Sequence, residues 1–433
     1  MYKVYFRQAM QMLRQNKFFS IVYITGTGLA ITMVMVLAIL YYFRTADIAP
    51  ETNRDRMMIV QHGKVNNKKG QGYGSSKLSY PTIKECFYRM QTPEAVTAIL
   101  PIGEQSEFIQ VQGNNDVYNG LVMGTDAAFW KVFQFSFLSG TPYTEEEFIS
   151  GIKKAVLNES LARRLFNTSD AAGKTFMLNF EEYIVSGVVK DIPSIAKYSY
   201  AEMWIPFTTR PSQIQGGSWC DYILGHMKVC ILAKKPGDFD AIRQEAKELC
   251  RRYNTTTVQY DFVLNNQPDT VFHAWMSEGD SFNSPELLKI YLQIILIILL
   301  LLLVPSINLT GMTASRMKKR MEELGIRKAF GAENRTLLMQ ILYENLLLTF
   351  LGGLAGLLGS YILIYLLKGW LLGNYNWDGS SLTASIDLSP GMLINPAIFG
   401  YTLIFCLVLN LMSALVPAWR ALRRPIVDAI NDK

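Results

Sequence analysis

Four apolar runs constrain this 433-residue chain more than any other feature. The first, residues 18–43, contains no charged side chain. A transmembrane helix needs about 20 mainly apolar residues, whereas the apolar core of a signal peptide has only about 7–15. The other runs lie within residues 287–311, 336–367 and 398–416. The sequence therefore predicts a membrane protein with four transmembrane helices.

Basic side chains gather in short segments beside these runs. Residues 1–17 carry four basic and no acidic side chains, and residues 312–335 carry seven basic and three acidic ones. An excess of Lys and Arg beside a span marks the cytoplasmic side of the membrane. Both termini and residues 312–335 are therefore expected in the cytoplasm. No aromatic and basic platform accompanies the charge, so nucleic acid is not an expected partner.

Residues 44–286 differ in composition from the apolar runs, with charges of both signs and no spanning segment. Because they follow a helix that enters from the cytoplasm, they are expected outside the cytoplasmic membrane. Five segments have the pattern of strands: 57–61, 155–157, 183–189, 203–207 and 228–232. Four have the pattern of helices: 81–90, 127–133, 159–166 and 239–253. This mixture predicts an α+β domain, built from two subdomains.

The whole chain is expected to divide into nine segments. In order, these are a cytoplasmic amphipathic helix lying in the lipid headgroup layer (1–17), a first span (18–43), an extracytoplasmic core domain (44–286), a second span (287–311), a cytoplasmic charged segment (312–335), a third span (336–367), an extracytoplasmic loop (368–397), a fourth span (398–416) and a cytoplasmic tail (417–433).

The charged segment has a helical pattern. Met317, Met321 and Leu324 share one face of a helix, which we expect to pack against the membrane helices. Glu323 lies four residues before Arg327, the favourable order for a helical ion pair. Gly325 is expected to interrupt this helix and Gly331 to end it. A plain topology anchor, which is the alternative, needs basic residues but neither the acidic residues nor the apolar stripe.

Several motifs resemble the MacB/FtsX-like family of ABC-transporter permeases. They are Arg320-x-Glu-Glu-Leu-Gly-Ile-Arg-Lys-Ala-Phe-Gly-Ala332 with Gln340 and Glu344, Leu13-Arg14-x-Asn16-Lys17, Gly124-Thr-Asp126 with Phe129, Phe135 and Gly140, Val156-Leu-Asn-Glu159, Gly173-Lys174, Val185-Ser-Gly-Val-Val189, and Pro417-Ala-Trp-Arg-Ala421 with Pro425. Together they cover nearly the whole chain. Glu333 departs from the pattern, because many members carry Ser or Thr there.

This resemblance implies a permease that acts as a mechanotransmitter in a bacterial inner membrane. The outer domain would have a MacB-like porter subdomain and a second subdomain. The permease would form a homodimer, or a heterodimer with a paralogue, and would pair with an ABC ATP-binding subunit that holds ATP and Mg²⁺. A periplasmic adaptor and an outer-membrane channel are further partners that the family brings. The residues implied in coupling to the ATPase are Arg320, Glu322, Glu323, Gly325, Arg327, Lys328, Gly331 and Ala332.

Three functions remain open at the level of the sequence. Efflux in the manner of MacB and lipoprotein extraction in the manner of LolC and LolE both fit the resemblance. A membrane-anchored sensor or scaffold, which would need no ATPase, is the rival from another class. An envelope enzyme has no support, because the three histidines, at positions 62, 226 and 273, form no recognisable catalytic set.

The chain itself is not expected to hydrolyse ATP. Gly173-Lys174-Thr175 looks like the end of a phosphate-binding loop, but that loop needs a glycine five residues earlier, where Thr168 stands. We therefore expect a turn before a strand at this place. No cofactor or metal is expected on the chain, and ATP hydrolysis is assigned to a separate subunit.

Polar and small residues mark the predicted spans. Gly352 and Gly356 are spaced to let two helices approach closely. Asn308 is expected to form a hydrogen bond between helices. Two roles are open for Glu344. It anchors the third span at the interface or bonds it to another helix, or it takes part in moving a proton or a substrate.

Four of the five cysteines, at positions 86, 220, 230 and 250, lie in the predicted outer domain. Four cysteines allow three pairings. The spacing of Cys220 and Cys230 leaves three states open for them: a disulfide, free buried thiols, or a metal site with His226.

Overall fold

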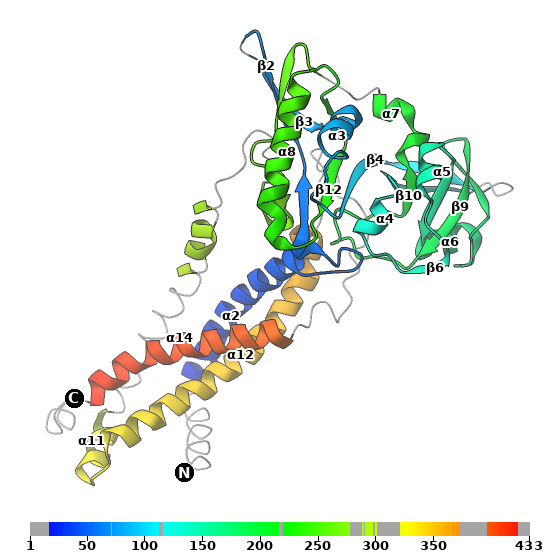
Figure 1. Cartoon of the computed structure of the whole chain (residues 1–433). Helices are drawn as coiled ribbons and strands as arrows, with labels where there is room; N and C mark the ends of the chain where they lie inside the picture. The colour runs from blue at the N-terminus through cyan, green and yellow to red at the C-terminus, as the bar shows by residue number, and fades with distance from the viewer. Residues whose placement is uncertain are drawn as a thin grey trace. The chain divides into compact units, whose positions relative to one another are not determined.

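In a computed structural model of the protein, the structure describes residues 17–70, 72–111, 116–215, 220–277, 321–372 and 396–422, with short helical stretches inside 288–300. The chain divides into two units (Figure 1). The helical unit consists of residues 1–42, 288–373 and 388–433. The sheet unit consists of residues 43–287 and 374–387. The main dividing points, at residues 43 and 287, lie next to the boundaries expected from the sequence.

The helical unit contains four described helices: α2 (Lys17–Thr45), α11 (Met321–Ala329), α12 (Asn334–Leu372) and α14 (Pro396–Leu422). Two segments of the described chain are long and apolar enough to cross a membrane, Ser20–Thr45 and Asn334–Leu367. The expected fourth span lies inside α14. The expected interfacial helix 1–17, loop 368–397 and tail 417–433, with most of the second span and Asn308, lie largely outside the described residues. The four-span topology therefore stays a prediction.

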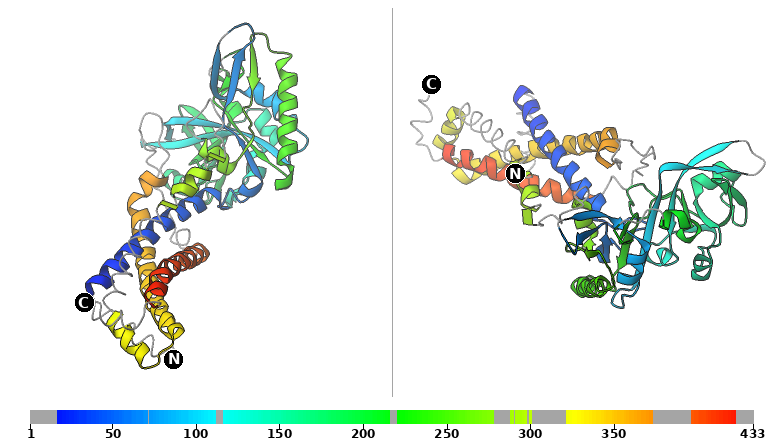
Figure 2. Two further views of the ribbon diagram at one scale, coloured as in Figure 1. Left: turned by 90° about the vertical axis from the view of Figure 1, so that its left-hand side faces the viewer. Right: turned by 90° about the horizontal axis from the view of Figure 1, so that it is seen from above.

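The sheet unit has an α+β fold built on two sheets (Figure 2). Its strands are β1 (Met57–Val60), β2 (Gly63–Asn67), β3 (Tyr73–Leu78), β4 (Ala95–Gln110), β5 (Val117–Thr125), β6 (Phe137–Gly140), β7 (Lys154–Asn158), β8 (Thr175–Leu178), β9 (Glu181–Val189), β10 (Met203–Pro206), β11 (Leu224–Gly225), β12 (Lys228–Leu232), β13 (Tyr260–Val263) and β14 (Asp269–Thr270). Its α-helices are α3 (Tyr80–Cys86), α4 (Phe129–Val132), α5 (Glu145–Ile149), α6 (Glu159–Phe166), α7 (Pro211–Gln215), α8 (Phe239–Asn254) and α9 (Val271–Met276). Each strand and helix expected in this region is present, with ends shifted by a few residues.

One large sheet runs through the whole unit in the order β14-β1-β12-β4-β5-β10-β7-β9-β6, with β8 paired to β4 and β9. A smaller sheet has the order β11-β3-β2-β13. The strand β4 is the longest, and a register shift between Ile102 and Glu107 bends its pairing with β5. The parts expected as two subdomains thus share one continuous sheet.

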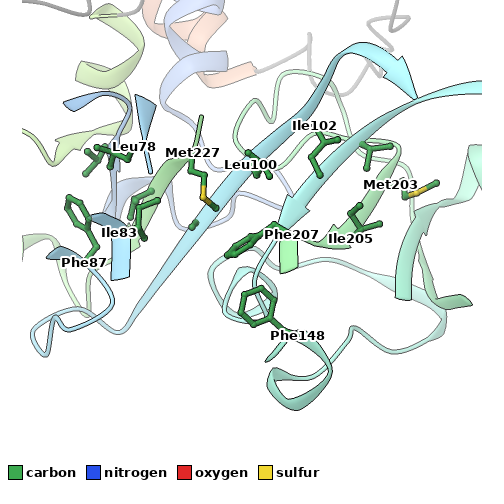
Figure 3. Close-up of a cluster of buried hydrophobic side chains, with 14 of the residues drawn as sticks. Leu78, Ile83, Phe87, Leu100, Ile102, Phe148, Met203, Ile205, Phe207 and Met227 are labelled. Carbon is green, nitrogen blue, oxygen red and sulfur yellow. The ribbon is translucent and has the colours of Figure 1, made fainter. Parts of the chain in front are cut away.

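Buried side chains form two main clusters in the sheet unit, and the strands alternate between them. In β12, Val229 and Ile231 belong to the first cluster, whereas Cys230 and Leu232 belong to the second. Figure 3 shows part of the first cluster, where side chains from α3, β4, β10 and the segments around them meet. The second cluster is rich in aromatic rings around α4, with Trp130 and Trp204 separated by 6.2 Å between ring centroids. The period of two along each strand explains this division.

Several residues of the outer-domain motifs hold turns and strands together. The Asp126 carboxylate accepts hydrogen bonds from the Thr97 hydroxyl, the Tyr88 hydroxyl and the amides of Ala98 and Phe129. Burial raises the pKa of Asp126 to about 6, although these hydrogen bonds act to lower it. At the segment that resembles a phosphate loop, Gly173 has φ +83° and the chain turns directly into β8. The expected turn before a strand is confirmed.

Candidate functional site in the helical unit

The charged segment forms a helix that folds back onto the next one. Helix α11 runs through Gly325 without a break, so the expected interruption there is wrong. A glycine inside a helix costs only about 1 kcal/mol, which neighbouring helix formers offset. The helix ends at Gly331, which has φ +89°. The Gly331 amide donates to the Lys328 carbonyl at 2.9 Å and the Ala332 amide to the Arg327 carbonyl at 3.0 Å, as in a Schellman motif.

A chain of polar side chains connects α11 to α12. The guanidinium of Arg327 donates to the side-chain carbonyl of Gln340 at 2.9 Å. The amide nitrogen of Gln340 donates in turn to the Glu344 carboxylate at 3.3 Å. Both Gln340 and Glu344 are buried. Each member donates a hydrogen bond to the next. The Gln340 amide therefore joins the positive Arg327 of α11 to the negative Glu344 of α12.

Arg327 is one of the residues expected to couple the chain to a partner ATPase, and its guanidinium contacts the chain's own helix α12. Its contact with a partner stays a prediction. Two apolar side chains at the end of this helix are exposed: Ile326, in α11, is 46% exposed, and Phe330, which follows the last residue of α11, is 89% exposed. Their spacing of four residues places them on one side of the helix. A break at Gly325 would remove the helical spacing of this pair, so the pair does not follow from the expected pattern and follows only from the unbroken helix.

The structure describes the other residues of the expected coupling set to different extents. Arg320, like Met317, lies outside the described residues. Glu322 and Glu323 lie in α11, but their side chains are outside the described set, so their ion pairs stay predictions. Lys328 is half-buried on the helix, and Ala332 follows its last turn.

The small residues Gly352 and Gly356 of α12 pack against α2. A Cβ added to Gly356 would lie 2.7 Å from the Gly28 carbonyl oxygen and 2.8 Å from the Ile31 Cβ. A Cβ on Gly352 would lie 2.9 Å from the Thr27 Cβ. Such distances are shorter than real contacts, so only glycine lets these backbones approach. The Thr32 hydroxyl also donates to the Gly356 carbonyl at 3.0 Å, which adds a polar link across the two helices.

A second polar cluster holds the last turn of α2 within the sheet unit. Arg54 donates to the Glu51 carboxylate at 2.8 Å and to the carbonyls of Phe43 and Ala46 at the end of α2. It also donates to the Ile195 carbonyl at 3.1 Å. The other Glu51 oxygen accepts from the Ser199 amide and hydroxyl, both at 3.1 Å. The hydrogen bonds of this buried ion pair therefore connect three segments of the chain.

Lys197 lies beside this cluster. Burial lowers the pKa of Lys197 to about 7, and the positive charges of Lys228 and Arg44 lower it further, whereas Glu51 acts in the opposite direction. Removing an ammonium group from water disfavours its charged form, and like charges nearby have the same effect. The charge state of this side chain therefore changes near neutral pH.

Free thiols are one of the three states that the sequence leaves open for Cys220 and Cys230. Cys220 and Cys230 are both free thiols. Cys230, a residue of β12, is buried in the second cluster. Cys220 is half-buried in a turn with φ +52° and packs against the first cluster. They therefore lie against different clusters of the unit. Within the described residues, no group of three or more His, Cys, Asp or Glu side chains has the arrangement of a metal site.

Two family models match the chain. The model of the MacB-like periplasmic core domain matches residues 20–249, and that of the FtsX-like permease C-terminal domain matches residues 295–426. The first match ends inside α8 of the sheet unit, and the second includes α11, α12 and α14.

Individual relatives agree with these matches. The uncharacterized ABC transporter permease YknZ of Bacillus subtilis is 21% identical over 331 residues, which is 76% of this chain and 74% of YknZ. The macrolide export ATP-binding/permease protein MacB of Escherichia coli K12 is 23% identical over 330 residues, covering 75% of this chain but only 45% of MacB. The chain thus spans less than half of that relative. The crystal structure of the periplasmic region of MacB from Actinobacillus actinomycetemcomitans aligns with a TM-score of 0.32 at 18% identity, covering 47% of this chain and 87% of the other.

Proposed function

The chain belongs to the family of ABC-transporter permeases that combine a MacB-like periplasmic core domain with an FtsX-like permease domain, and we propose that it couples ATP hydrolysis in a partner subunit to movement of its outer domain. One observation carries the proposal: α11 is tied to α12 through Arg327 while Phe330 and Ile326 face outward. An exposed aromatic and aliphatic pair on a short helix is the kind of anchor that fills a pocket of a partner protein.

The partner is the ABC ATP-binding subunit, with its ATP and Mg²⁺, on the cytoplasmic side of a bacterial inner membrane. Phe330 and Ile326 enter an apolar pocket of that subunit, and the closing motion of the ATPase pulls on α11. The hydrogen bonds from Arg327 to Gln340 and from Gln340 to Glu344 pass this displacement to α12, because a buried hydrogen-bonded charge resists separation. The close contact of Gly356 with Gly28 passes it to α2.

The last turn of α2 delivers the displacement to the outer domain. The carbonyls of Phe43 and Ala46 are held by Arg54, which also holds Ile195. A shift of this turn therefore moves β1 and the loop around Ile195 together. A dimer of permease chains uses the movement of its outer domains to drive export from the cell envelope.

The capture of an ATPase tests this proposal directly. We expect the full chain, purified in detergent from its native host, to bring an ABC ATP-binding protein with it and to stimulate its ATPase activity. Phe330→Ser should weaken that association by about 30-fold or more, which corresponds to an interface anchor of about 2 kcal/mol. Arg327→Met should retain the association but reduce the stimulation, because the anchor remains and the connection to α12 is lost.

Phe180→Ser is the matched control, since Phe180 is 91% exposed but lies in the sheet unit. It should leave both association and stimulation unchanged. If no ATP-binding protein is captured, the chain is a membrane-anchored sensor or scaffold instead. If an ATPase is captured equally well by the Phe330→Ser variant, α11 is not the docking surface.

A further inference from the structure

Helices α3 and α8 pack against each other in the sheet unit (Figure 1), and each carries one cysteine of the first cluster, Cys86 and Cys250. Cys86 is the last residue of α3, and Cys250 lies one turn before the end of α8. Their exposed fractions are 0% and 5%, and both belong to the first cluster of buried side chains. Both are free thiols in the structure, and the neighbouring Cys250 side chain is the main cause that raises the pKa of Cys86.

A second contact across the same two helices fixes this arrangement. The Thr82 hydroxyl donates to the Tyr253 hydroxyl at 3.4 Å. Thr82 precedes Cys86 by four residues, and Tyr253 follows Cys250 by three, so both pairs lie on the facing sides of α3 and α8. The approach of the thiols therefore follows from the way the helices pack, rather than from one side-chain rotamer.

We propose that Cys86 and Cys250 form a disulfide when the sheet unit folds outside the cytoplasmic membrane. The location rests on the proposed function, whereas the choice of partners rests on the contacts of α3 and α8. Of the three ways to pair four cysteines, the packing of α3 against α8 favours the one that contains Cys86–Cys250. The second bridge of that pairing is not expected to form, because Cys220 and Cys230 lie against different clusters.

The oxidant is an external disulfide, carried by a thiol oxidoreductase or a small thiol such as glutathione. The thiolate of one cysteine attacks a sulfur of that disulfide, which forms a mixed disulfide and releases one thiol of the oxidant. The second cysteine then attacks the mixed disulfide and releases the other thiol. The two cysteines lose two electrons and two protons in total, and the oxidant gains them.

The burial of the pair decides when this reaction takes place. The neighbouring Cys250 thiol and burial raise the pKa of Cys86, so the folded domain holds almost none of the reactive thiolate. The thiols are therefore oxidised before α8 closes over α3, while they are still open to solvent. Once closed, the bond is protected from reductants by the same burial.

The bond would stabilise a seam between distant parts of the chain. Cys86 belongs to the segment before β4, and Cys250 belongs to the segment after β12, so the cross-link encloses most of the strands of the large sheet. A link that closes so long a loop removes much of the freedom of the unfolded chain. The α3–α8 seam would then stay closed while other parts of the outer domain move.

Mass spectrometry of the native chain tests the proposal. The full chain is isolated from its native host in the presence of an alkylating agent and digested without reductant. We expect one linked peptide pair that contains Cys86 and Cys250, and an alkylated Cys230 once the protein is denatured. Recovery of both Cys86 and Cys250 as alkylated thiols, or in links to other cysteines, would overturn the proposal.

Thermal unfolding gives a second measurement on the same preparation. Dithiothreitol, added under conditions that open the sheet unit, should lower its Tm by about 5–10 °C in the natural chain. It should not change the Tm of a Cys86→Ala/Cys250→Ala variant, whatever the starting Tm of that variant. Cys230→Ala is the control and should keep the full response. A linked pair without a captured ATPase would reject only the coupling role, and free thiols with a captured ATPase would reject only the disulfide.

Discussion

The two units of this protein achieve close packing in opposite ways. The sheet unit fills its interior with large side chains, such as the fully buried Trp204, Phe129 and Phe207. The helical unit has glycines in place of larger side chains where the backbones of α2 and α12 approach each other, at Gly28 and Gly356. In water, burying a large apolar side chain is itself favourable. In lipid it gains little, so helices associate through close backbone contact and hydrogen bonds such as that of Thr32.

The buried polar groups of the two units also differ in their arrangement. In the sheet unit, Arg54 and Glu51 use their arms to connect three segments. In the helical unit, Arg327, Gln340 and Glu344 form a single line between two helices. A cluster holds its members in place from several sides, whereas a line transmits a displacement along one direction. We interpret the first as an anchor and the second as a connection.

The largest effect should come from breaking the anchor. Arg54→Met leaves the Glu51 carboxylate buried without its cation, so we expect the sheet unit to lose about 3–5 kcal/mol of its free energy of unfolding. Urea unfolding followed by the fluorescence of the buried tryptophans measures this loss. Arg251→Met, which breaks an exposed ion pair with Glu248, should leave the free energy of unfolding nearly unchanged.

A partner substitution sharpens this result. Arg54→Met/Glu51→Leu removes both charges, and it should recover part of the stability lost by Arg54→Met alone. Equal instability of the single and double variants would mean that the hydrogen bonds to the carbonyls, and not the buried charge, carry the anchor.

A smaller effect is expected from filling the glycine contact. Gly356→Ala places a methyl group against the Gly28 carbonyl, so we expect the association of α2 and α12 to weaken by about 1–3 kcal/mol. Thermal unfolding of the full chain in detergent should show a lower Tm. Gly400→Ala on α14 has open space around it and should leave the Tm unchanged or raise it, because alanine is the better helix former. The same sign for both variants would contradict the glycine contact.

The smallest predicted effect is a pH dependence in the sheet unit. Lys197 has a pKa of about 7 in the folded chain, against an ordinary value of 10.5. Between these values the unfolded chain binds more protons than the folded one, so stability should rise with pH, by about 1–2 kcal/mol from pH 7 to 9. Below pH 7 both states are protonated and the destabilising effect is complete.

Substitution of the same lysine tests this dependence. Lys197→Met should flatten the pH profile of urea unfolding between pH 7 and 9 and raise the stability at pH 7. The exposed Lys235 is the control, since Lys235→Met should leave the slope unchanged. A slope that survives in Lys197→Met would assign the titration to another group.

Local patterns predicted the short elements well and the long hairpin poorly. Strands such as β7 and β12 are apolar runs flanked by helix starts and turns, so their identity is encoded within a few residues. The strands β4 and β5 were not predicted, because β4 contains Pro101 and its pairing depends on partners far along the chain. In the candidate site, Gly331 followed from its residue type, whereas the orientation of Arg327 did not.

Local composition and spacing are enough to predict long apolar helices, a mixed α+β domain and a charged helix that ends at a glycine. The contact of Arg327 with Gln340 and the exposure of Phe330 are not encoded in such local patterns. The same holds for Cys86, which has a second thiol as its neighbour, whereas Cys230 lies in the other cluster. These outcomes depend on which faces of distant elements pack together, and that choice is made by the burial of the whole core.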